Sequence, residues 1–261
     1  FQAEDGIRDC LLSRGLGDVY KRQLMNIIDF QNVTVFQGRN KVLDDFSLTI
    51  DESQSTVILG PNGSGKTTLL KLLNRELYIV EEKNSSLKIF EKDRWNVDEL
   101  RSNLGVVSQH LQYGYSSSAI GLYVVLSGFY SSDGIWQHQE FDESKLDRAK
   151  EVMDLLSITH LKDREFSTMS TGEQRKFLLA RSLVNDPAVL VFDEPTSGLD
   201  MSTCFQYLEI IRELISMGKK VILVTHHIHE IPPEVTRVIL LKEGRVIEDG
   251  DKDQILSLIH I

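Results

Sequence analysis

The sequence predicts an α/β fold whose core is a parallel β-sheet covered by helices on both faces. Three short runs are almost entirely apolar, at residues 56–60, 188–192 and 221–225. Strands that are buried on both faces of a parallel sheet have continuous apolar sequences of this kind. The second and third runs each follow a helical pattern, as expected where strands and helices alternate around such a sheet.

Further β-structure is expected on either side of this core. Residues 27–36 alternate apolar and polar side chains as an edge strand does, and a second β-rich run covers residues 42–50. These two runs predict an antiparallel β-subdomain. Near the end of the chain, residues 238–241 and 246–248 are joined by a turn at 242–245, which predicts a hairpin.

Two helical regions are expected between the strands. A helix from residue 66 to about residue 77 follows the glycine-rich turn that ends the first apolar run. The middle of the chain, roughly residues 98–168, has aromatic and Ser/Gly-rich stretches and then an amphipathic helix, which predicts an inserted α-helical subdomain. The apolar face of that helix is expected to hold Leu146, Ala149, Met153 and Leu156.

The two ends of the sequence differ in character from the rest. Residues 1–23 resemble the translated adapter sequence that occurs at the ends of fragmentary gene assemblies. Residues 257–261 resemble the same artefact, with a short native tail as the alternative. We therefore expect one domain over residues 25–256, starting at Met25. Cys204 has no partner at a metal-binding or disulfide spacing, and we interpret it as a small buried hydrophobic residue.

The composition limits the classes of function. With 41% hydrophobic and 26% charged residues, the chain has the balance of a globular protein. Its net charge of -10 argues against a general affinity for nucleic acid, which needs clustered Lys and Arg, so no nucleic-acid partner is expected. No run approaches the roughly 18 apolar residues of a membrane-spanning helix, and the N-terminus lacks the apolar core of a signal peptide. We therefore expect a cytoplasmic protein.

A glycine-rich segment after the first apolar run fits the pattern G-x-x-x-x-G-K-[ST], in the strand-to-helix context that a phosphate-binding loop requires. It predicts a P-loop NTPase with a RecA-like core. The glycines let backbone N–H groups point at phosphates, and the helix N-terminus adds a favourable dipole. Lys66 is expected to reach the β- and γ-phosphates of ATP, and Thr67 to bind Mg²⁺. The expected ATP-binding residues here are Gly60, Pro61, Asn62, Gly63, Ser64, Gly65, Lys66, Thr67 and Thr68.

Two acidic residues end the second apolar run, at the edge of a parallel sheet where ligands bind. Asp193 is expected to hold Mg²⁺, directly or through water. Glu194, one residue further on and facing the γ-phosphate, is expected to orient and deprotonate the attacking water as the general base. A strand that ends in Asp-Glu is more often a solvated cap when it occurs alone, so this interpretation depends on the phosphate loop.

Residues 169–174, MSTGEQ, lie shortly before the strand that ends in the two acids. This segment resembles the LSGGQ signature that ABC ATPases carry at the same place, and with the other motifs it makes nearly the whole chain similar to that family. The resemblance implies that two cassettes pack head to tail with two ATP molecules between them, either as a homodimer or with a different, paired cassette. It also implies that Ser170 and Gly172 contact the γ-phosphate of the nucleotide bound by the opposite subunit.

The signature segment departs from the family pattern at three positions. Met169 stands for Leu, Thr171 for Gly and Glu173 for Gln, and by the resemblance Thr171 and Glu173 still belong to the surface that faces the opposite nucleotide. A second interpretation is that Ser170 or Thr171 caps the helix that follows. Capping and contact with the opposite nucleotide are compatible, so both interpretations stay open.

Four further residues occur in the family's order. The resemblance implies that Phe36 stacks on adenine, with a half-buried edge-strand aromatic as the alternative. It implies that Gln109 touches Mg²⁺ and the attacking water and couples the site to a transmembrane partner. It implies that Asp200 reaches across the dimer, and that His226 is the switch histidine that hydrogen-bonds the γ-phosphate.

An aromatic tract at residues 113–136 follows Gln109. By the resemblance, this is where the cassettes of transporters receive a helix from the membrane subunit. The alternative is that aromatic residues at mixed spacing fill the core of a small helical lobe. Both interpretations stay open for each aromatic residue.

Two stretches, VLSGF at residues 125–129 and LVTHHIHEIP at 223–232, resemble bacterial ABC proteins associated with molybdate or iron-complex uptake. The resemblance implies the motor subunit of an importer of a metal complex or oxyanion, bound to a permease at the inner face of the membrane. One alternative is a soluble, non-transport ABC ATPase of tandem or regulatory type, truncated here. Another is a cassette that binds ATP without hydrolysing it, against which Glu194 and His226 argue.

Overall fold

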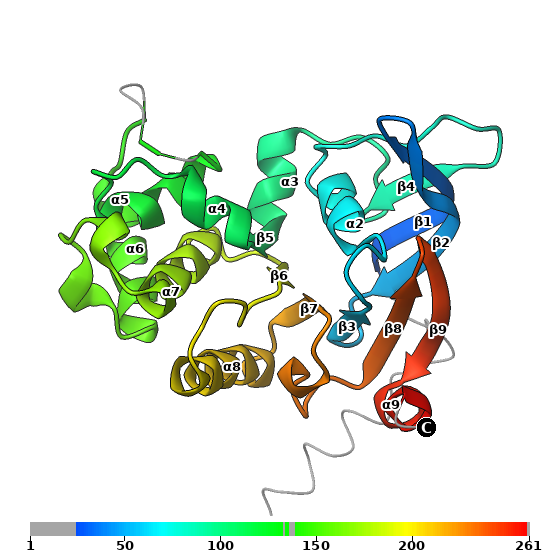
Figure 1. Cartoon of the computed structure of the whole chain (residues 1–261). Helices are drawn as coiled ribbons and strands as arrows, with labels where there is room; N and C mark the ends of the chain where they lie inside the picture. The colour runs from blue at the N-terminus through cyan, green and yellow to red at the C-terminus, as the bar shows by residue number, and fades with distance from the viewer. Residues whose placement is uncertain (1–24, 133, 136–138, 260–261) are drawn as a thin grey trace, which may run out of the picture.

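The computed structural model describes residues 25–132, 134–135 and 139–259 (Figure 1). The segment expected to be an artefact at residues 1–23 lies outside the described residues, as do residues 260–261 and Trp136 of the aromatic tract. In the part of the chain that the structure describes, no helix has the length and apolar character needed to cross a bilayer.

A six-stranded sheet forms the core, in the order β5-β6-β7-β3-β8-β9. Neighbouring strands from β5 to β8 are parallel, and β9 pairs with β8 in antiparallel orientation as the predicted hairpin. The strands in sheet order are Leu104–Val107, Val189–Asp193, Lys220–Thr225, Thr56–Leu59, Arg237–Lys242 and Arg245–Asp251. This arrangement confirms the predicted α/β class with a parallel-sheet core.

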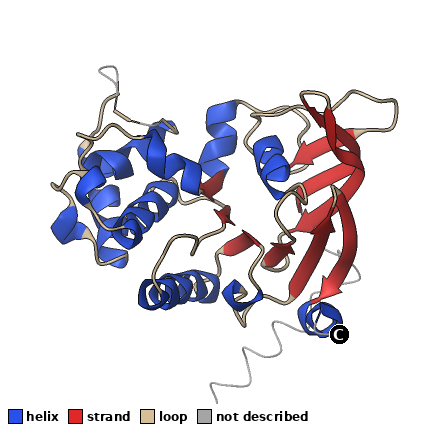
Figure 2. Ribbon diagram, viewed as in Figure 1, coloured by secondary structure: helices blue, strands red, loops and turns tan. Residues whose placement is uncertain are grey.

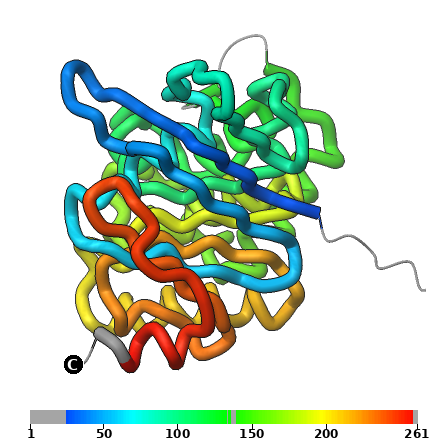
Figure 3. Tube along the Cα trace, turned by 90° about the vertical axis from the view of Figure 1, so that its right-hand side faces the viewer, coloured from blue at the N-terminus to red at the C-terminus, as the bar shows by residue number. Residues whose placement is uncertain are grey.

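A second, antiparallel sheet has the order β2-β1-β4. Its strands are β1 (Asn26–Gln37), β2 (Asn40–Asp51) and β4 (Ser86–Ile89). Figure 3 shows the blue β1–β2 hairpin across one side of the molecule, beside the red β8–β9 hairpin. Two contacts join these hairpins: Arg237 Nη2 donates to the Thr49 carbonyl oxygen at 2.8 Å, and Arg245 Nη2 lies 3.2 Å from Asp44 Oδ2.

The helices fall into two groups (Figures 1 and 2). A helical lobe, which contains α4 to α7, projects from one end of the main sheet, while the remaining α-helices lie along the sheets. The α-helices are α2 (Lys66–Leu73), α3 (Val97–Asn103), α4 (Gln109–Gly114), α5 (Gly121–Leu126), α6 (Glu143–Leu155), α7 (Thr171–Leu183), α8 (Met201–Ser216) and α9 (Lys252–Ile259). The short 3-10 helices are η1 (Ser127–Tyr130), η2 (Thr159–Leu161), η3 (Phe166–Thr168) and η4 (Ile228–Glu230).

The main sheet is buried on both faces, which explains its continuous apolar strands. In β3, Val57 packs into the core shared with the helical lobe, whereas Ile58 packs into the core shared with the antiparallel sheet. In β7, Leu223 and Val224 divide in the same way. Successive side chains of a strand point to opposite faces, so the side chains of a doubly covered strand are mostly apolar; Thr56 and Thr225, at the strand ends, are buried exceptions.

Some predicted boundaries differ from those of the structure. The range expected for the helical insertion, 98–168, contains β5, a strand of the main sheet, and the helical lobe continues past it into α7. The helix predicted to reach about residue 77 ends at Leu73, because Arg75 takes a left-handed conformation with φ 57°. Leu146 is 40% exposed because it lies at the edge of the apolar face of α6.

The aromatic tract divides between the core and the surface. Tyr113 is 76% exposed, whereas Tyr115 packs edge-on against Phe166, with ring centroids 5.5 Å apart. Phe129 is half-buried against the core. Cys204, expected to be buried, is only partly so and packs against the same core.

Candidate active site at the carboxyl ends of the central strands

The phosphate loop (residues 60–67) joins β3 to α2, as predicted. Gly63 and Gly65 have φ of 81° and 105°, a region that L side chains rarely adopt, and Gly65 is the N-cap of α2. Gly60 is enclosed, because a Cβ there would lie 2.4 Å from the Leu241 carbonyl oxygen. The Gly60 N–H donates to the Thr225 carbonyl at 3.2 Å. These constraints hold the loop at the ends of β3, β7 and β8.

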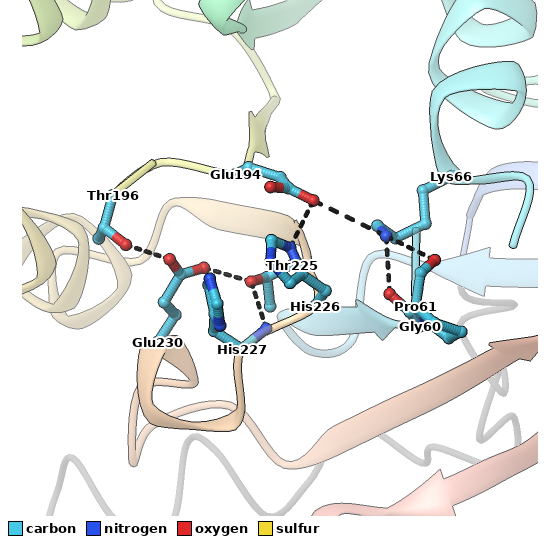
Figure 4. Close-up of polar contacts among 9 residues, drawn as sticks. All are labelled: Gly60, Pro61, Lys66, Glu194, Thr196, Thr225, His226, His227 and Glu230. Carbon is cyan, nitrogen blue, oxygen red and sulfur yellow. Dashed lines mark hydrogen bonds and ion pairs between the residues drawn. The ribbon is translucent and has the colours of Figure 1, made fainter. Parts of the chain in front are cut away.

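Lys66 is buried at the start of α2, with its ammonium group held by the loop itself (Figure 4). Its Nζ donates to the carbonyl oxygens of Gly60, at 2.7 Å, and Pro61, at 3.1 Å. The same nitrogen lies 3.7 Å from Glu194 Oε1. The backbone of the loop and one carboxylate therefore place the positive charge inside the site.

The two predicted acids lie next to this charge. Asp193 is the last residue of β6, and Glu194 follows it in a left-handed conformation, φ 47°, with its N–H donating to the Val224 carbonyl at 2.8 Å. Burial, with the nearby charge of Glu194, raises the pKa of Asp193 to about 6, although Lys66 and Arg175 act in the opposite direction. A raised carboxyl pKa beside a phosphate loop is typical of a functional site.

His226 completes the cluster from the end of β7. Its Nδ1 lies 2.8 Å from Glu194 Oε1 (Figure 4). A neutral imidazole that donates from Nδ1 to a carboxylate has Nε2 free as an acceptor, and a protonated ring donates from both nitrogens. The structure thus brings together Lys66, Glu194 and His226, three of the four residues for which the sequence predicted a catalytic role.

Gln109, the fourth, is the first residue of α4 and is half-buried. Its neighbours Ser108 and His110 line a cavity of about 620 Å³ between α2 and the helical lobe. Thr67 and Asp193 line the same cavity, whereas Gln109 is not among its lining residues. The structure therefore places Gln109 beside this cavity without showing a contact to the catalytic cluster.

The chemistry of this cavity fits a hard divalent cation. Thr67 offers a hydroxyl oxygen and Asp193 a carboxylate, and Mg²⁺ prefers oxygen ligands of this kind. Mg²⁺ is usually bound through one or two protein groups together with substrate phosphates, so two protein ligands at the end of the phosphate loop are sufficient.

Phe36 lies near the end of β1 and is 45% exposed. The next residue, Gln37, donates from Nε2 to Thr68 Oγ1 at 3.2 Å, which brings this end of β1 to the first turn of α2. Lys41 Nζ lies 6.0 Å from the centroid of the Phe36 ring. Phe36 thus presents an accessible aromatic surface on a strand that contacts the phosphate-loop helix, and adenine stacking stays a prediction.

The signature segment forms the N-terminus of α7. Ser170 is the N-cap and forms a capping box with Glu173: the Glu173 N–H donates to Ser170 Oγ at 3.3 Å, and the Ser170 N–H donates to Glu173 Oε2 at 2.7 Å. The predicted cap by Ser170 is therefore confirmed, and Thr171 is the exposed first residue of the helix. The Ser170 N–H holds the pKa of Glu173 below its usual value.

Asp200 lies close to the signature segment. It caps α8 by accepting the Thr203 N–H at 3.1 Å. A Cβ on Gly172 would lie 2.4 Å from Thr203 Cγ2, so the N-termini of α7 and α8 touch at this point. Among the described residues, no hydrogen bond or ion pair joins Ser170, Gly172 or Asp200 to the phosphate loop. The predicted site residues therefore form two separate groups within one chain.

Several buried polar residues near the site were not predicted. Glu230 is 1% exposed and accepts hydrogen bonds from the hydroxyls of Thr196 and Thr225. Arg175 is completely buried and donates to the Ser197 carbonyl at 3.3 Å, while its Nε and Nη1 have no hydrogen-bond partner among the described residues. A Glu in a polar stretch gives no sequence signal of burial, because such residues are mostly exposed.

Comparison with known proteins agrees with this geometry. The family model described as ABC transporter matches residues 43–197. The hemin import ATP-binding protein HmuV of Aliivibrio fischeri is 33% identical over 85% of this chain and 84% of its own length. The glutamine transport ATP-binding protein GlnQ of Bacillus subtilis is 30% identical over 86% of this chain and 90% of its own length.

Solved structures show the same fold. CbiO1 from Clostridium perfringens, part of the transporter complex cbiONQ, has a TM-score of 0.74 at 25% identity and covers 89% of this chain and 91% of that one. A dimeric bacterial ABC transporter cassette has a TM-score of 0.70 at 26% identity, covering 86% of this chain and 98% of that one. The fold and the phosphate loop agree with the family match. The chain belongs to the ABC transporter family as an ATP-binding cassette with ATPase activity.

Proposed function

We propose that this cassette is the motor subunit of an ABC importer, and that Glu194, Lys66 and His226 carry out its ATP hydrolysis. One observation carries the catalytic part of this proposal. The Glu194 carboxylate is placed at the end of β6 with Lys66 Nζ at 3.7 Å and His226 Nδ1 at 2.8 Å from the same oxygen. The proposed general base Glu194 thus lies beside the phosphate loop, next to the ammonium group of Lys66 and the imidazole of His226.

The residues divide the reaction between them. The N–H groups of the phosphate loop and Lys66 bind the β- and γ-phosphates of ATP. Glu194 accepts a proton from the attacking water, whose oxygen bonds to the γ-phosphorus while the bond to the β–γ bridging oxygen breaks, so ADP and phosphate are formed. His226 hydrogen-bonds the γ-phosphate, and Gln109 orients the water.

Thr67, Asp193 and Gln109 would hold Mg²⁺. When bound, Mg²⁺ neutralises negative charge on the β- and γ-phosphate oxygens. Asp193 must be ionised to act as a ligand, and burial raises its pKa to about 6, so its ionised form carries a cost that a bound cation would offset.

Catalysis is proposed to need a second cassette. Ser170, Thr171, Gly172, Glu173 and Asp200 lie together at the N-termini of α7 and α8, separate from the phosphate loop of the same chain. In a head-to-tail dimer, this surface would meet the γ-phosphate bound by the partner. The dimeric cassette of similar fold supports this assembly.

The transport part of the proposal comes from the relatives. Hemin import, glutamine transport and the complex cbiONQ appear in their names, so we propose a permease partner and a position at the inner, cytoplasmic face of the cell membrane. A metal complex or an oxyanion is the proposed cargo class. Closure of two cassettes on ATP and reopening after hydrolysis would drive the permease between its states.

Glu194→Gln is the variant that tests the catalytic assignment. It keeps the volume of the side chain but removes the base, so we expect phosphate release to fall at least about 10²-fold. We expect sedimentation at saturating Mg²⁺-ATP to show a trapped dimer. Glu81→Gln, at an exposed position in a loop, is the matched control and should behave as wild type. A Glu194→Gln protein that stays monomeric with ATP would contradict the dimer mechanism.

Sequencing of the source DNA on both sides of this reading frame tests the transport assignment. A neighbouring gene that encodes several apolar spans of about 20 residues would supply the candidate permease. Co-expression of that protein with the cassette should then yield a membrane complex whose ATPase rate differs from that of the cassette alone. A frame that continues into a second cassette, with no membrane gene nearby, would favour a soluble ABC ATPase.

A further inference from the structure

A buried carboxylate links the two loops that carry Glu194 and His226. Glu230, the last residue of η4, is 1% exposed. Its Oε1 accepts the hydroxyl of Thr196 and its Oε2 accepts the hydroxyl of Thr225 (Figure 4). The two oxygens of one side chain are thus each used by a different segment of the chain.

The first segment is the turn after β6. Thr196 lies two residues after Glu194, within a turn that is closed by the Ser197 N–H donating to the Glu194 carbonyl at 3.2 Å. Glu194 itself has a left-handed backbone, which is strained for a residue with a side chain. A strained residue keeps its conformation only where its surroundings fix it. The hydrogen bond from Thr196 to Glu230 is one such restraint.

The second segment is the end of β7. Thr225 directly precedes His226, and its Oγ1 accepts the His227 N–H at 2.9 Å as well as donating to Glu230. The Glu230 N–H in turn donates to the His227 carbonyl at 3.2 Å. The backbone on both sides of His226 is therefore fixed relative to the Glu230 carboxylate.

We propose that Glu230 is a positioning residue, which holds Glu194 and His226 at their separation of 2.8 Å by anchoring Thr196 and Thr225. This inference rests on the proposed roles of Glu194 and His226. Glu230 does not touch the reacting atoms in this scheme. It acts through the two threonines on the base and on the imidazole.

The chemistry of a carboxylate suits this position. A carboxylate has two acceptor oxygens, so each can accept a hydrogen bond from one threonine hydroxyl, whereas Gln has one acceptor oxygen and an NH2 donor. The buried guanidinium of Arg175 supplies a positive charge near Glu230. Burial lowers the pKa of Arg175, and the electrostatic interaction with Glu230 is one of those that raise it again.

Loss of the anchor would misplace the catalytic pair rather than the phosphate loop. A displacement of about 1 Å in a reacting group can cost on the order of 10²-fold in rate. The Lys66 hydrogen bonds to Gly60 and Pro61 do not involve Glu230, and the Thr225 carbonyl that accepts the Gly60 N–H belongs to the β7 backbone, which pairs with β3. ATP should therefore still bind. A fall in kcat with little change in the KM for ATP is the kinetic result of losing an interaction that acts only on the chemical step.

The experiment measures steady-state ATP hydrolysis by full-chain variants with Mg²⁺-ATP. Glu230→Leu removes both hydrogen bonds, and Thr196→Val removes one hydroxyl at nearly constant shape. Thr56→Val is the matched control, because Thr56 is a buried threonine at the opposite end of β3 whose hydroxyl has no hydrogen-bond partner among the described residues. We expect kcat to fall about 10- to 100-fold in the first two variants, and to stay within about twofold for Thr56→Val.

Two further variants separate positioning from a general effect on folding. Glu230→Gln keeps the volume and one acceptor, so we expect it to restore part of the kcat that Glu230→Leu loses. In a Glu194→Gln background, Glu230→Leu should cause little additional loss in single-turnover rate, because residues that act as a unit are not additive. A purely structural role predicts instead that the two losses add and that the loss in kcat follows the loss in thermal stability.

Three outcomes would overturn the inference. The first is that Thr196→Val and Glu230→Gln both keep a kcat within about twofold of wild type. The second is that the losses in the Glu194→Gln, Glu230→Leu double variant are additive. If Glu230→Leu does not fold, Thr196→Val and Glu230→Gln still decide the matter. The third is an equal loss in Thr56→Val. Wild-type hydrolysis by Glu194→Gln would overturn the proposed function itself, whereas an inactive Glu194→Gln with fully active Glu230 variants would overturn only the role of Glu230.

Discussion

Nδ1 of His226 lies 2.8 Å from Oε1 of Glu194, the oxygen that also lies 3.7 Å from Nζ of Lys66. One carboxylate oxygen therefore faces two nitrogens, one from His226 at the end of β7 and one from Lys66 in the first turn of α2. This arrangement fixes the ring of His226, because a ring held by a hydrogen bond at one nitrogen presents the other in a defined direction. The following predictions test what this geometry and its neighbours do.

Loss of the imidazole should reduce catalysis without reducing ATP binding. We expect His226→Ala to lower the rate of phosphate release by about 10²-fold or more, because it removes the γ-phosphate hydrogen bond and the partner of Glu194. His229→Ala is the matched control, since His229 is an exposed histidine three residues after His226. Malachite-green assays and equilibrium binding of fluorescent ATP give the two readouts. Equal rates for the two variants would show that His226 has no catalytic part.

Asp193 should make the stability of the protein without ATP and Mg²⁺ depend on pH. Its pKa is raised from 3.8 to about 6 in the folded state, mainly by burial. The folded state therefore binds this proton more tightly than the unfolded state, and the free energy of unfolding decreases as pH rises from about 4 through about 6. Above about pH 7 the cost is on the order of 2–3 kcal/mol, because one pKa unit corresponds to about 1.4 kcal/mol.

Asp193→Asn isolates this effect from other titrating groups. We expect the variant to be more stable than wild type at pH 8, and the difference to disappear near pH 4, where Asp193 is protonated. Urea unfolding followed by circular dichroism in EDTA measures both free energies. A difference that is constant from pH 4 to pH 8 would rule out titration of Asp193 in this range.

The capping box of α7 should contribute to stability. Glu173→Ala removes the acceptor of the Ser170 N–H, and we expect a loss of about 1 kcal/mol at pH 7. The pKa of Glu173 is lowered in the folded state, so its ionised form contributes this stability above the unfolded value of 4.5. The contribution should be lost as pH falls below 4.5 through the folded pKa. Thermal unfolding at pH 7 and pH 3 checks this sign, and a larger difference at pH 3 would contradict it.

The contact between α7 and α8 gives a two-residue test. A Cβ on Gly172 would lie 2.4 Å from Thr203 Cγ2, so Gly172→Ala should destabilise the protein by about 1–3 kcal/mol. Thr203→Ser removes that methyl group and keeps the hydroxyl that donates to Asp200. We expect Thr203→Ser to recover most of the loss when combined with Gly172→Ala. Additive losses in the double variant would show that this contact is not the cause.

The fold was predictable where each strand carried its own pattern. Residues 188–192 and 221–224 are apolar at every position, because β6 and β7 are buried on both faces. The strands β4 and β5 were missed because each has four residues, too few to show a period, and neither leads into a recognisable motif; β3 is equally short but is followed by the glycine-rich loop.

The site was predictable where residue type and spacing determine the chemistry. The phosphate loop, Asp193 and Glu194 occupy the predicted ends of β3 and β6. Glu230 was not predictable, because its importance comes from burial between two loops that meet only in the folded chain. The sequence shows a Glu in a polar stretch, and only the structure shows its two threonine partners.

The place of β3 in the main sheet affects when the site can form during synthesis. β3 lies between β7 and β8, and the phosphate loop that follows it is held by the Thr225 carbonyl and by the Gly244 N–H, which donates to the Ser64 carbonyl at 3.0 Å. Both partners leave the ribosome long after residue 67. At about 5–20 residues per second, the loop waits roughly ten seconds or more for them. The nascent chain therefore cannot complete its nucleotide site until the β8–β9 hairpin has emerged.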